Sequence, residues 1–344
     1  MERLRNGRTA NGAGTAAASH GTGPEPTPLA ARPELLPADC GLGVRFWGVR
    51  GSFPRGGEAT LRYGGSTPCV EVRCAGRRVI IDAGTGIVPL GKVVAAEASA
   101  DDAPPRVDLL LSHLHHDHVM GLPFFMPLLT RGATVRMHVG NLGGDTAEAA
   151  LNCLFSPPLF PVTLSQLPAR VEHVGFRAGE TLHLPEREGA PALDIRTVLL
   201  DHPSGATAYR FDHAGRSLAY VSDVEHRDGG PDAALVRFLE GVDLVIYDAM
   251  FTEGQFQGCR GWGHSTWRAG VALCEEAGAA RLVAFHHHPA HDDATLDAME
   301  AELSAARPGS FVAREGTSLT LSAEAALPLG RGRAPATRRA AASR

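Results

Sequence analysis

The chain has 344 residues, a length that suggests about two domains or one large α/β domain. It is 44% hydrophobic and 21% charged, as in a globular protein, and it contains no apolar run long enough to cross a membrane. The net charge of −5 gives no global electrostatic reason to bind nucleic acid, so a long nucleic acid is not an expected partner. No apolar stretch follows the N-terminal arginines, which argues against a secretory signal and predicts a cytoplasmic protein.

Two terminal segments differ in composition from the rest of the chain. Residues 1–41 are rich in Ala, Gly, Pro and Thr and nearly lack aromatic and β-branched residues, so they are predicted to be a disordered extension. Residues 326–344 form a basic tail, which is predicted to be flexible. One folded domain is therefore expected over residues 42–325.

Short apolar strands alternate with Gly- and Asp-rich breaks through this domain, and helices follow later in each half. Strands are predicted at 43–48, 69–74, 77–82, 106–111, 133–139, 193–200, 207–212, 217–222, 242–247 and 281–286. Helices are predicted at 144–154, 232–240, 264–278 and 292–305. Two successive groups of strands, each followed by helices, favour an α/β fold in which two sheets pack face to face with helices outside. The segment 140–168 interrupts the strand rhythm and is predicted to be an inserted lid or an interface, which leaves a homodimer open.

Potential metal ligands crowd into the segment that follows the strand ending at Leu111. His113, His115, Asp117 and His118 fall within six positions, and alternate residues of an extended chain share a face. A turn or helix start after His115 would bring Asp117 and His118 into the same pocket. Imidazole and carboxylate are the ligands that zinc prefers, so the spacing predicts a metal site. His116 is out of phase with the others and is predicted not to be a ligand.

Three more candidate ligands each follow a predicted strand downstream. These are His202, Asp223 and His286. Each of them alone is compatible with an ordinary strand-end or turn residue, and only its position favours His286 within the triplet of histidines at 286–288. A site built at one edge of two packed sheets requires this repeated order of apolar strand and then ligand.

The motif His113-x-His115-x-Asp117-His118 resembles the signature of the metallo-β-lactamase superfamily. The stretch from about Gly43 to Asp293 is similar to the phosphodiesterase branch of that superfamily, which includes the tRNA 3′-processing ribonuclease and the cyclic-phosphate phosphodiesterases. The landmarks that carry this similarity are 48–52, 63–65, 81–86, 121–125, 209–210, 222–223, 261–266 and 285–286. The resemblance implies a four-layer αββα sandwich and makes residues 42–325 a metal-dependent hydrolase domain.

The resemblance also implies roles for individual residues. One divalent ion would lie on His113, His115 and His202, a second on Asp117, His118 and His286, and Asp223 would bridge them. Zinc is the first choice for both ions and manganese the second. Asp117 and His264 would be the catalytic residues, with His264 as the proton donor. Asp82 would orient a ligand imidazole. Apart from the resemblance, the place of Arg50 near the glycine-rich loops is compatible with holding an anionic substrate and equally with a surface ion pair.

Among the departures of the sequence from the tRNA-processing pattern, two bear on the reaction and its substrate. No acidic residue lies near Ala219 to support His264, which leaves Asp248 or Glu225 as the substitute. No long arm that could grip tRNA is visible either. The leading hypothesis is therefore a phosphodiesterase for a small or cyclic phosphodiester.

Two other functions remain open. The first is hydrolysis of a lactone, thioester or lactam on the same metal site, with the apolar side chains of Phe124, Phe125, Phe155 and Phe160 lining the pocket. The second is a metal-containing binding or cofactor-assembly protein that turns nothing over.

Overall fold

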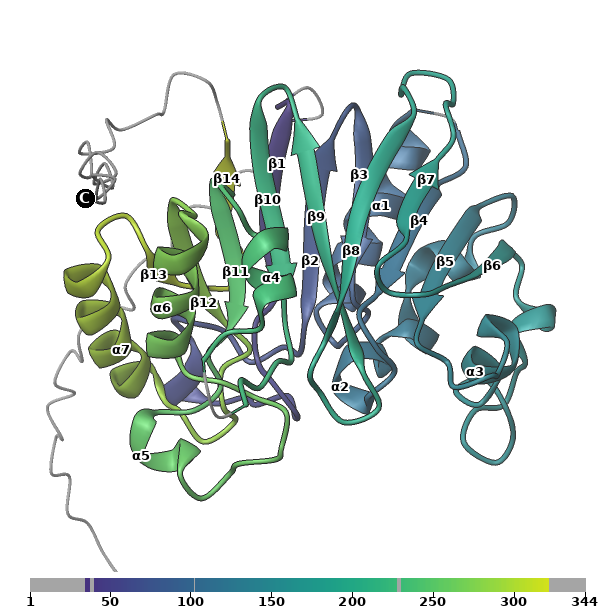
Figure 1. Ribbon diagram of the computed structural model, residues 1–344. Coiled ribbons are helices and arrows are strands. Elements are labelled where there is room, and N and C mark those ends of the chain that lie inside the picture. The colour runs from purple at the N-terminus through teal and green to yellow at the C-terminus, as the bar shows by residue number, and fades with distance from the viewer. Residues whose placement is uncertain (1–34, 38–39, 102, 228–229, 322–344) are drawn as a thin grey trace, which may run out of the picture. The chain divides into compact units, whose positions relative to one another are not determined.

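The computed structural model describes residues 35–37, 40–101, 103–227 and 230–321 (Figure 1). All of these residues belong to one compact unit that runs from Glu34 onward. The predicted N-terminal extension (1–41) lies outside the described residues except for 35–37 and 40–41. The predicted basic tail (326–344) lies wholly outside them.

The described chain forms two seven-stranded sheets. The first sheet has the order β14-β1-β2-β3-β4-β5-β6, with β1 Leu42–Gly48, β2 Cys69–Cys74, β3 Arg77–Ile81, β4 Arg106–Leu111, β5 Thr134–Gly140, β6 Arg170–Phe176 and β14 Ser318–Thr320. The second sheet has the order β13-β12-β11-β10-β9-β8-β7, with β7 Thr181–Leu184, β8 Leu193–Leu200, β9 Ala206–His213, β10 Arg216–Val221, β11 Leu244–Asp248, β12 Arg281–Phe285 and β13 Phe311–Val312. Strands β3 to β6 are parallel to one another, and so are β10 to β13.

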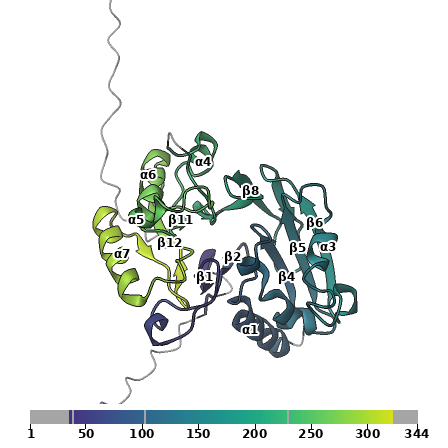
Figure 2. The ribbon, with the colours of Figure 1, turned by 90° about the horizontal axis from the view of Figure 1, so that it is seen from below.

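Helices cover the outer faces of both sheets, except for α5, which buries no residue. They are α1 Ile87–Ala100, α2 His116–Val119, α3 Ala147–Asn152, α4 Ala233–Phe238, α5 Glu253–Phe256, α6 Trp267–Ala277 and α7 Asp293–Ala306, with short 3-10 turns at Glu58–Thr60, Leu122–Phe124, Met126–Leu129 and Leu164–Gln166. In Figure 2, α6 and α7 lie beyond β11 and β12 on one side, and α1 lies beyond β1 and β2 on the other. Every helix within the described ranges falls short of what a bilayer span requires.

Three apolar cores hold these layers together. The middle core joins the facing sides of the two sheets, for example Val72 of β2 and Ile246 of β11. The outer faces of the sheets pack against helices in two further cores, one containing Leu90 of α1 and the other Leu273 of α6. The order helix, sheet, sheet, helix confirms the predicted αββα sandwich, because alternate residues along each strand supply both an inner and an outer apolar face.

The segment 140–168 forms the crossover between β5 and β6. It carries α3, whose Leu151 packs with Phe155 in the outer core of the first sheet. Phe125 and Phe155 are fully buried in this core, so they do not line a substrate pocket as the acyl-hydrolase hypothesis suggested. Phe124 is 59% exposed and contacts Phe160, with ring centroids 6.2 Å apart.

Strand direction places the candidate ligands at one edge of the sandwich. His113 follows β4, Asp223 follows β10 and His286 follows β12, each at the carboxyl end of its strand. Strand β8, which precedes His202, runs in the same direction as β10 because both are antiparallel to β9. A backbone bridge between Arg50 and His287 joins the chain after β1 to the chain after β12 at this edge.

Candidate metal centre

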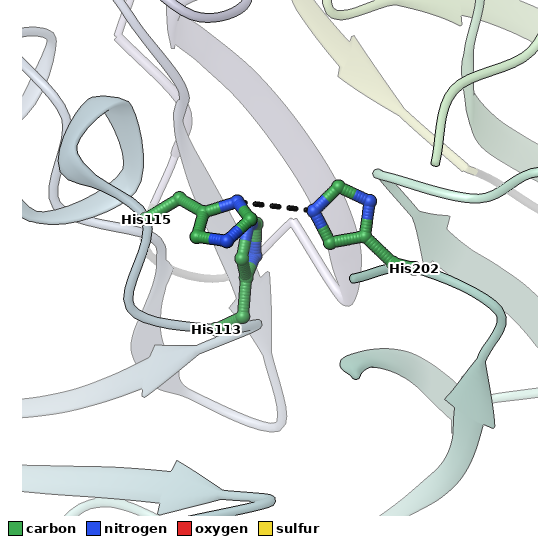
Figure 3. Close-up of side chains that lie close together, drawn as sticks. All are labelled: His113, His115 and His202. Carbon is green, nitrogen blue, oxygen red and sulfur yellow. Dashed lines mark hydrogen bonds between the residues drawn. The ribbon is translucent and has the colours of Figure 1, made fainter. Parts of the chain in front are cut away.

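Three histidines meet at the first half of the centre. His113, His115 and His202 each offer a ring nitrogen to a group in which these atoms lie within 4.8 Å of one another (Figure 3). His202 Nε2 lies 3.1 Å from His115 Nδ1, as the dashed line in Figure 3 marks. His202 Nδ1 donates to the carbonyl of Gly263 at 2.8 Å, which leaves Nε2 as the nitrogen with a free lone pair.

The second half of the centre consists of Asp117, His118 and His286. Asp117 Oδ2 lies 3.3 Å from His118 Nε2 and 3.2 Å from His286 Nε2, and these two nitrogens are 3.2 Å apart. The backbone N–H of Ser52 donates to the same carboxylate oxygen at 2.7 Å. Gly51 leaves room for the His286 ring, since a Cβ there would lie 2.5 Å from His286 Nδ1.

Asp223 lies between the two groups of three. Its Oδ1 is 3.9 Å from His113 Nε2 and 3.4 Å from His286 Nε2, while its Oδ2 is 3.2 Å from His118 Nε2. The side chain is buried, and two carboxylate oxygens directed at different histidines can serve two ions. The structure thus brings together all seven residues that were predicted as metal ligands.

The donor set fits divalent ions in three ways. His113 Nε2 is buried without any hydrogen-bond partner, as expected for an atom reserved for a metal. The nitrogen pairs 3.1 and 3.2 Å apart match two imidazoles on one tetrahedral zinc, where Zn–N bonds of about 2.0–2.1 Å separate the nitrogens by roughly 3.3 Å. Burial lowers the pKa of His113, His115 and His202, which favours the neutral rings that bind metals.

The carboxylates of the centre are held in the charged form. Burial acts to raise the pKa of Asp117, but the neighbouring His118 and His286 together outweigh it, so the pKa is lowered. Burial acts in the same way on Asp223, and His118 and His286 bring its pKa well below the ordinary range. Anionic oxygens among neutral or partly charged imidazoles are suited to hold a cation.

Asp82 supports this arrangement from behind. Its Oδ2 accepts from His118 Nδ1 at 2.8 Å and from the hydroxyl of Tyr220 at 2.7 Å, and its Oδ1 accepts from the backbone N–H of Ser112 at 2.7 Å. A carboxylate on Nδ1 fixes the ring tautomer so that Nε2 of His118 faces the centre. The predicted role of Asp82 as an orienting group agrees with these contacts.

His264 lies against the centre, with its ring stacked on His286 at 5.1 Å between centroids. Its Nδ1 is 2.9 Å from Asp248 Oδ2 at the end of β11, so Asp248 is the acidic partner that the sequence left undecided. Glu225, the other candidate, instead accepts from the backbone N–H groups of Gly261 and Gly263. Burial acts to lower the pKa of His264, but Asp248, with smaller effects of Asp223 and Asp117, outweighs it and raises the pKa to about 9.

The local structure at His264 differs from the prediction. The helix expected from residue 264 begins at Trp267, and the hydroxyl of Thr266 caps it by accepting from the N–H of Ala269. His264 therefore lies in the loop before α6. In the loop, the orientation of the His264 ring is set by its contacts with Asp248 and His286. In a helix, the direction of the side chain would instead follow from the helix geometry.

The contacts of Arg50 indicate a supporting role. Its guanidinium is fully buried and donates to the backbone carbonyls of Gly64, His288 and His291. These bonds hold the loop that follows His286. They leave no exposed part of the side chain for a substrate, so neither the anion-holding role nor the surface ion pair considered for Arg50 matches its position.

The structure shows the roles of several neighbouring residues that the sequence left undecided or did not indicate. His116 is exposed on α2 and belongs to none of the groups that could hold a metal among the described residues. His287 donates from Nε2 to the carbonyl of Ala313 instead of joining the centre. Ser112 and Tyr220 were missed, and only their places, next to His113 and on the inner face of β10, could have indicated their contact with Asp82.

Two residues of the centre and two that support it share an unusual backbone conformation. Ser52, Asp82, Asp223 and His286 have φ angles of +60° to +62°, the left-handed region that residues with a side chain seldom adopt. Three of these four follow directly on a strand of the core or lie one residue beyond it. The turn aims each side chain into the edge of the sandwich, and strained positions of this kind concentrate at functional sites.

A model of the family described as the beta-lactamase superfamily domain matches residues 77–287. This span is more than half of the chain and contains all seven residues of the centre. The chain belongs to the beta-lactamase superfamily. Members of this superfamily are metallo-hydrolases, and the match confirms the resemblance that the histidine motif indicated.

Individual relatives of this superfamily member agree with the predicted branch. Ribonuclease Z of Halorubrum lacusprofundi is 25% identical over 272 residues, which cover 66% of this chain and 84% of the relative. A diphosphatase from the PhnP family has a similar crystal structure, with a TM-score of 0.56 and 20% identity over 82% of this chain and 98% of that one. Zinc-bound PqqB from Methylobacterium extorquens has a TM-score of 0.59 at 16% identity, covering 81% of this chain and 100% of that one.

Because their sequence identities to this chain are low, the two solved structures show only that the fold is shared. The name ribonuclease Z runs against the prediction that a long nucleic acid is not a partner. That prediction rested on net charge and on the lack of a visible arm, and neither feature describes the surface beside the centre.

Proposed function

We propose that the protein is a phosphodiesterase that holds two divalent ions, zinc in the first place, on the seven-residue centre. The observation that carries this proposal is the pair His264 and Asp248, which lies in contact with the centre and is bonded at 2.9 Å. A buried imidazole with an elevated pKa, directly beside two potential metal positions, suits protonation of an alkoxide leaving group. The relatives named ribonuclease Z and the PhnP-family diphosphatase support the same reaction class.

The chain's own residues divide the work in this proposal. When bound, the two ions would supply Lewis acidity and lower the pKa of a water that attacks phosphorus. His113, His115 and His202 would hold one ion, and Asp117, His118 and His286 the other. Asp223 would join the two positions, because its oxygens face histidines of both groups.

The proton donor is defined by its hydrogen bond. Because Asp248 occupies Nδ1 of His264, only Nε2 is left to give a proton to the leaving oxygen. The ring stacks on His286 and lies 5.3 Å from His202 between centroids, so it reaches both halves of the centre. Glu225 fixes the loop that carries His264 through the N–H groups of Gly261 and Gly263, at 2.8 Å from each.

The surface beside His202 favours a small substrate. A cavity of about 640 Å³ lies there, and its wall includes the apolar side chain of Leu199. Its charged residues are Asp201, Glu225 and Asp232 against the single Arg227. An acidic wall repels a chain of phosphates, whereas a single phosphodiester is held mainly by the ions. We therefore keep the small or cyclic phosphodiester as the proposed substrate.

A panel of substrates tests this proposal. The zinc-loaded protein should hydrolyse bis-p-nitrophenyl phosphate and at least one cyclic nucleotide faster than p-nitrophenyl acetate, a lactone or a thioester. Faster turnover of the acyl substrates would replace the proposal by the acyl-hydrolase function. Cleavage of a tRNA precursor with a kcat/KM above that of every small diester would show that the substrate is a long RNA. No turnover of any of them by the metal-loaded protein would favour a binding or cofactor-assembly role.

A further inference from the structure

A second polar cavity lies at the opposite edge of the first sheet from the metal centre. It has a volume of about 310 Å³ and is walled by the first residues of β3, β4, β5 and β6 together with the turn after β7. Strands β3 to β6 are parallel, so their amino ends form this cavity while the centre lies at their carboxyl ends. The proposed hydrolysis uses none of the residues that line it.

Positive charge predominates in this cavity. Five arginines line it against three carboxylates, which leaves two positive charges in excess; the arginines are Arg77, Arg106, Arg136, Arg170 and Arg187. Three are anchored: Arg77 donates to the carbonyls of Pro185 and Pro191, and Arg136 and Arg170 pair with Glu172 through Nε. Their bonds orient the guanidiniums and leave terminal N–H groups for an anion.

The cavity also holds an acceptor that lacks a partner. Asp108 is 2% exposed, and its Oδ2 makes no hydrogen bond. The nearest guanidinium nitrogens are those of Arg187 at 3.4 Å and Arg77 at 3.8 Å, too long for good hydrogen bonds. A buried carboxylate oxygen without a donor is costly, and burial raises the pKa of Asp108 accordingly. The cavity therefore offers donors on several sides and one acceptor at its base.

We propose that this cavity is a binding site for inorganic phosphate. Phosphate has oxygens that accept from several guanidiniums, and at neutral pH it still carries at least one O–H that can donate to Asp108. Sulfate has the same size and the same acceptors but no proton at this pH. The unpartnered Asp108 oxygen thus predicts discrimination between two anions that the arginines alone would bind alike.

Calorimetric titration of the full-length, zinc-loaded protein with phosphate and with sulfate tests the site. The variants Arg187→Gln and Arg136→Gln should each weaken one phosphate-binding event by about tenfold or more, since each removes a charged donor. The double variant Arg196→Gln/Arg268→Gln removes the same kind of charge from exposed ion pairs elsewhere and should leave that event unchanged. Any phosphate that binds at the metal centre does so equally in the wild type, the site variants and the control, so it does not affect the difference between them.

Asp108→Asn provides the second, independent reading. It keeps the volume of the side chain and removes the charged acceptor, so the preference of this site for phosphate over sulfate should fall from at least tenfold to near one. All variants should keep the wild-type rate on bis-p-nitrophenyl phosphate, which separates this site from the proposed activity. Equal binding of sulfate by the wild type, or a loss of affinity in the Arg196→Gln/Arg268→Gln control as large as that of Arg187→Gln, would overturn the proposal.

Discussion

Single residues of the centre act through one another. Two histidines of the centre are fixed by a contact on their other ring nitrogen, His118 by Asp82 and His202 by the Gly263 carbonyl. Such contacts hold a ring in one tautomer and one orientation. The side chain is then already ordered before the metal binds, and little conformational entropy is lost on binding. The supporting group therefore matters for metal affinity almost as much as the ligand does.

Asp82→Asn should weaken zinc binding about 10–100-fold, because it removes the charged acceptor that orients His118. Competition with a chromophoric chelator measures the affinity directly. Asp212→Asn, which alters a half-exposed pair with Arg196 away from the centre, is the control and should bind zinc as the wild type does. An Asp82→Asn protein that folds and keeps full zinc affinity would contradict the orienting role.

His264→Ala should keep both ions and lose about 10²–10⁴-fold in kcat, the contribution typical of a general acid. Metal analysis and steady-state kinetics on the same sample provide the two readings, with exposed His116→Ala as the control that changes neither.

Asp248→Asn removes the charge that raises the pKa of His264, so the alkaline limb of the pH profile of kcat should move to lower pH in this variant. Loss of metal together with activity in His264→Ala would make His264 a ligand instead.

The site residues could be predicted to the extent that the chain places them next to one another or at strand ends. His113 to His118 form a continuous motif, and His202, Asp223 and His286 each follow a strand. The partner of His264 could not be chosen from the sequence, because Asp248 and Glu225 are both acidic and both close to strand ends. The choice depends on how β10 pairs with β11. In the folded protein Asp248 contacts the ring of His264, whereas Glu225 contacts the backbone of Gly261 and Gly263.

At the scale of elements, strands of the buried core were predictable and marginal elements were not. All ten predicted strands exist within two residues of the predicted ends, since apolar runs between turn residues have one simple interpretation. The edge strands β6, β7, β13 and β14 were missed because they are short or lack a clear alternation of burial. Helix α1 was missed because Pro89, Gly91 and paired valines give it a weak helical signal.

Packing supplies what α1 lacks in intrinsic helix preference. Pro89 lies in the first turn, where a missing N–H is tolerated. Gly91 lets α1 approach the 3-10 turn at Met126–Leu129 closely, since a Cβ there would lie 2.9 Å from the backbone nitrogen of Met126. Tertiary contacts of this kind override local propensity and are not readable from one sequence.

A close contact between the loop after β3 and the end of α2 holds the histidine motif in place. The N–H of Gly121 donates to the carbonyl of Ala83, and a Cβ on Gly121 would lie 2.1 Å from the carbonyl oxygen of Gly84. Gly121→Ala should therefore lower the free energy of unfolding by about 1–3 kcal/mol, as overpacking typically does.

Urea unfolding of the two proteins measures this difference. Gly175→Ala is the matched control, because its Cβ would meet nothing within 4 Å and its φ is not in the left-handed region. Equal stability of Gly121→Ala and Gly175→Ala would show that the loop and α2 are not locked together as described.

At the scale of the whole molecule, the free energy of unfolding should decrease at acidic pH because of one buried histidine. His138 on β5 is 3% exposed, neither of its ring nitrogens has a partner, and burial lowers its pKa to about 4. Between about pH 6.5 and pH 4 the unfolded chain binds a proton that the folded one does not. Stability is therefore lost as the pH falls through this window.

His138→Leu should remove this part of the acid sensitivity. The free energy of unfolding of the wild type, compared between pH 7 and pH 4.5, should fall by roughly 1–3 kcal/mol more than that of the variant. Urea unfolding at the two pH values provides the comparison, and His183→Leu, at an exposed pair with Asp194, should behave as the wild type does. An acid loss of equal size in wild type and His138→Leu would assign the sensitivity to other groups.

The two halves of the centre come from both sheets, so metal binding and the assembly of the whole sandwich are coupled. His113 to His118 follow a strand of the first sheet, while His202, Asp223 and His286 each follow a strand of the second. A stepwise zinc titration of the metal-free protein, with phosphodiesterase activity measured at each step, tests whether the centre works with two ions. Activity on bis-p-nitrophenyl phosphate should rise with the second ion and be complete at two ions per chain. Full activity with one ion, or no activity with two, would contradict a two-ion centre.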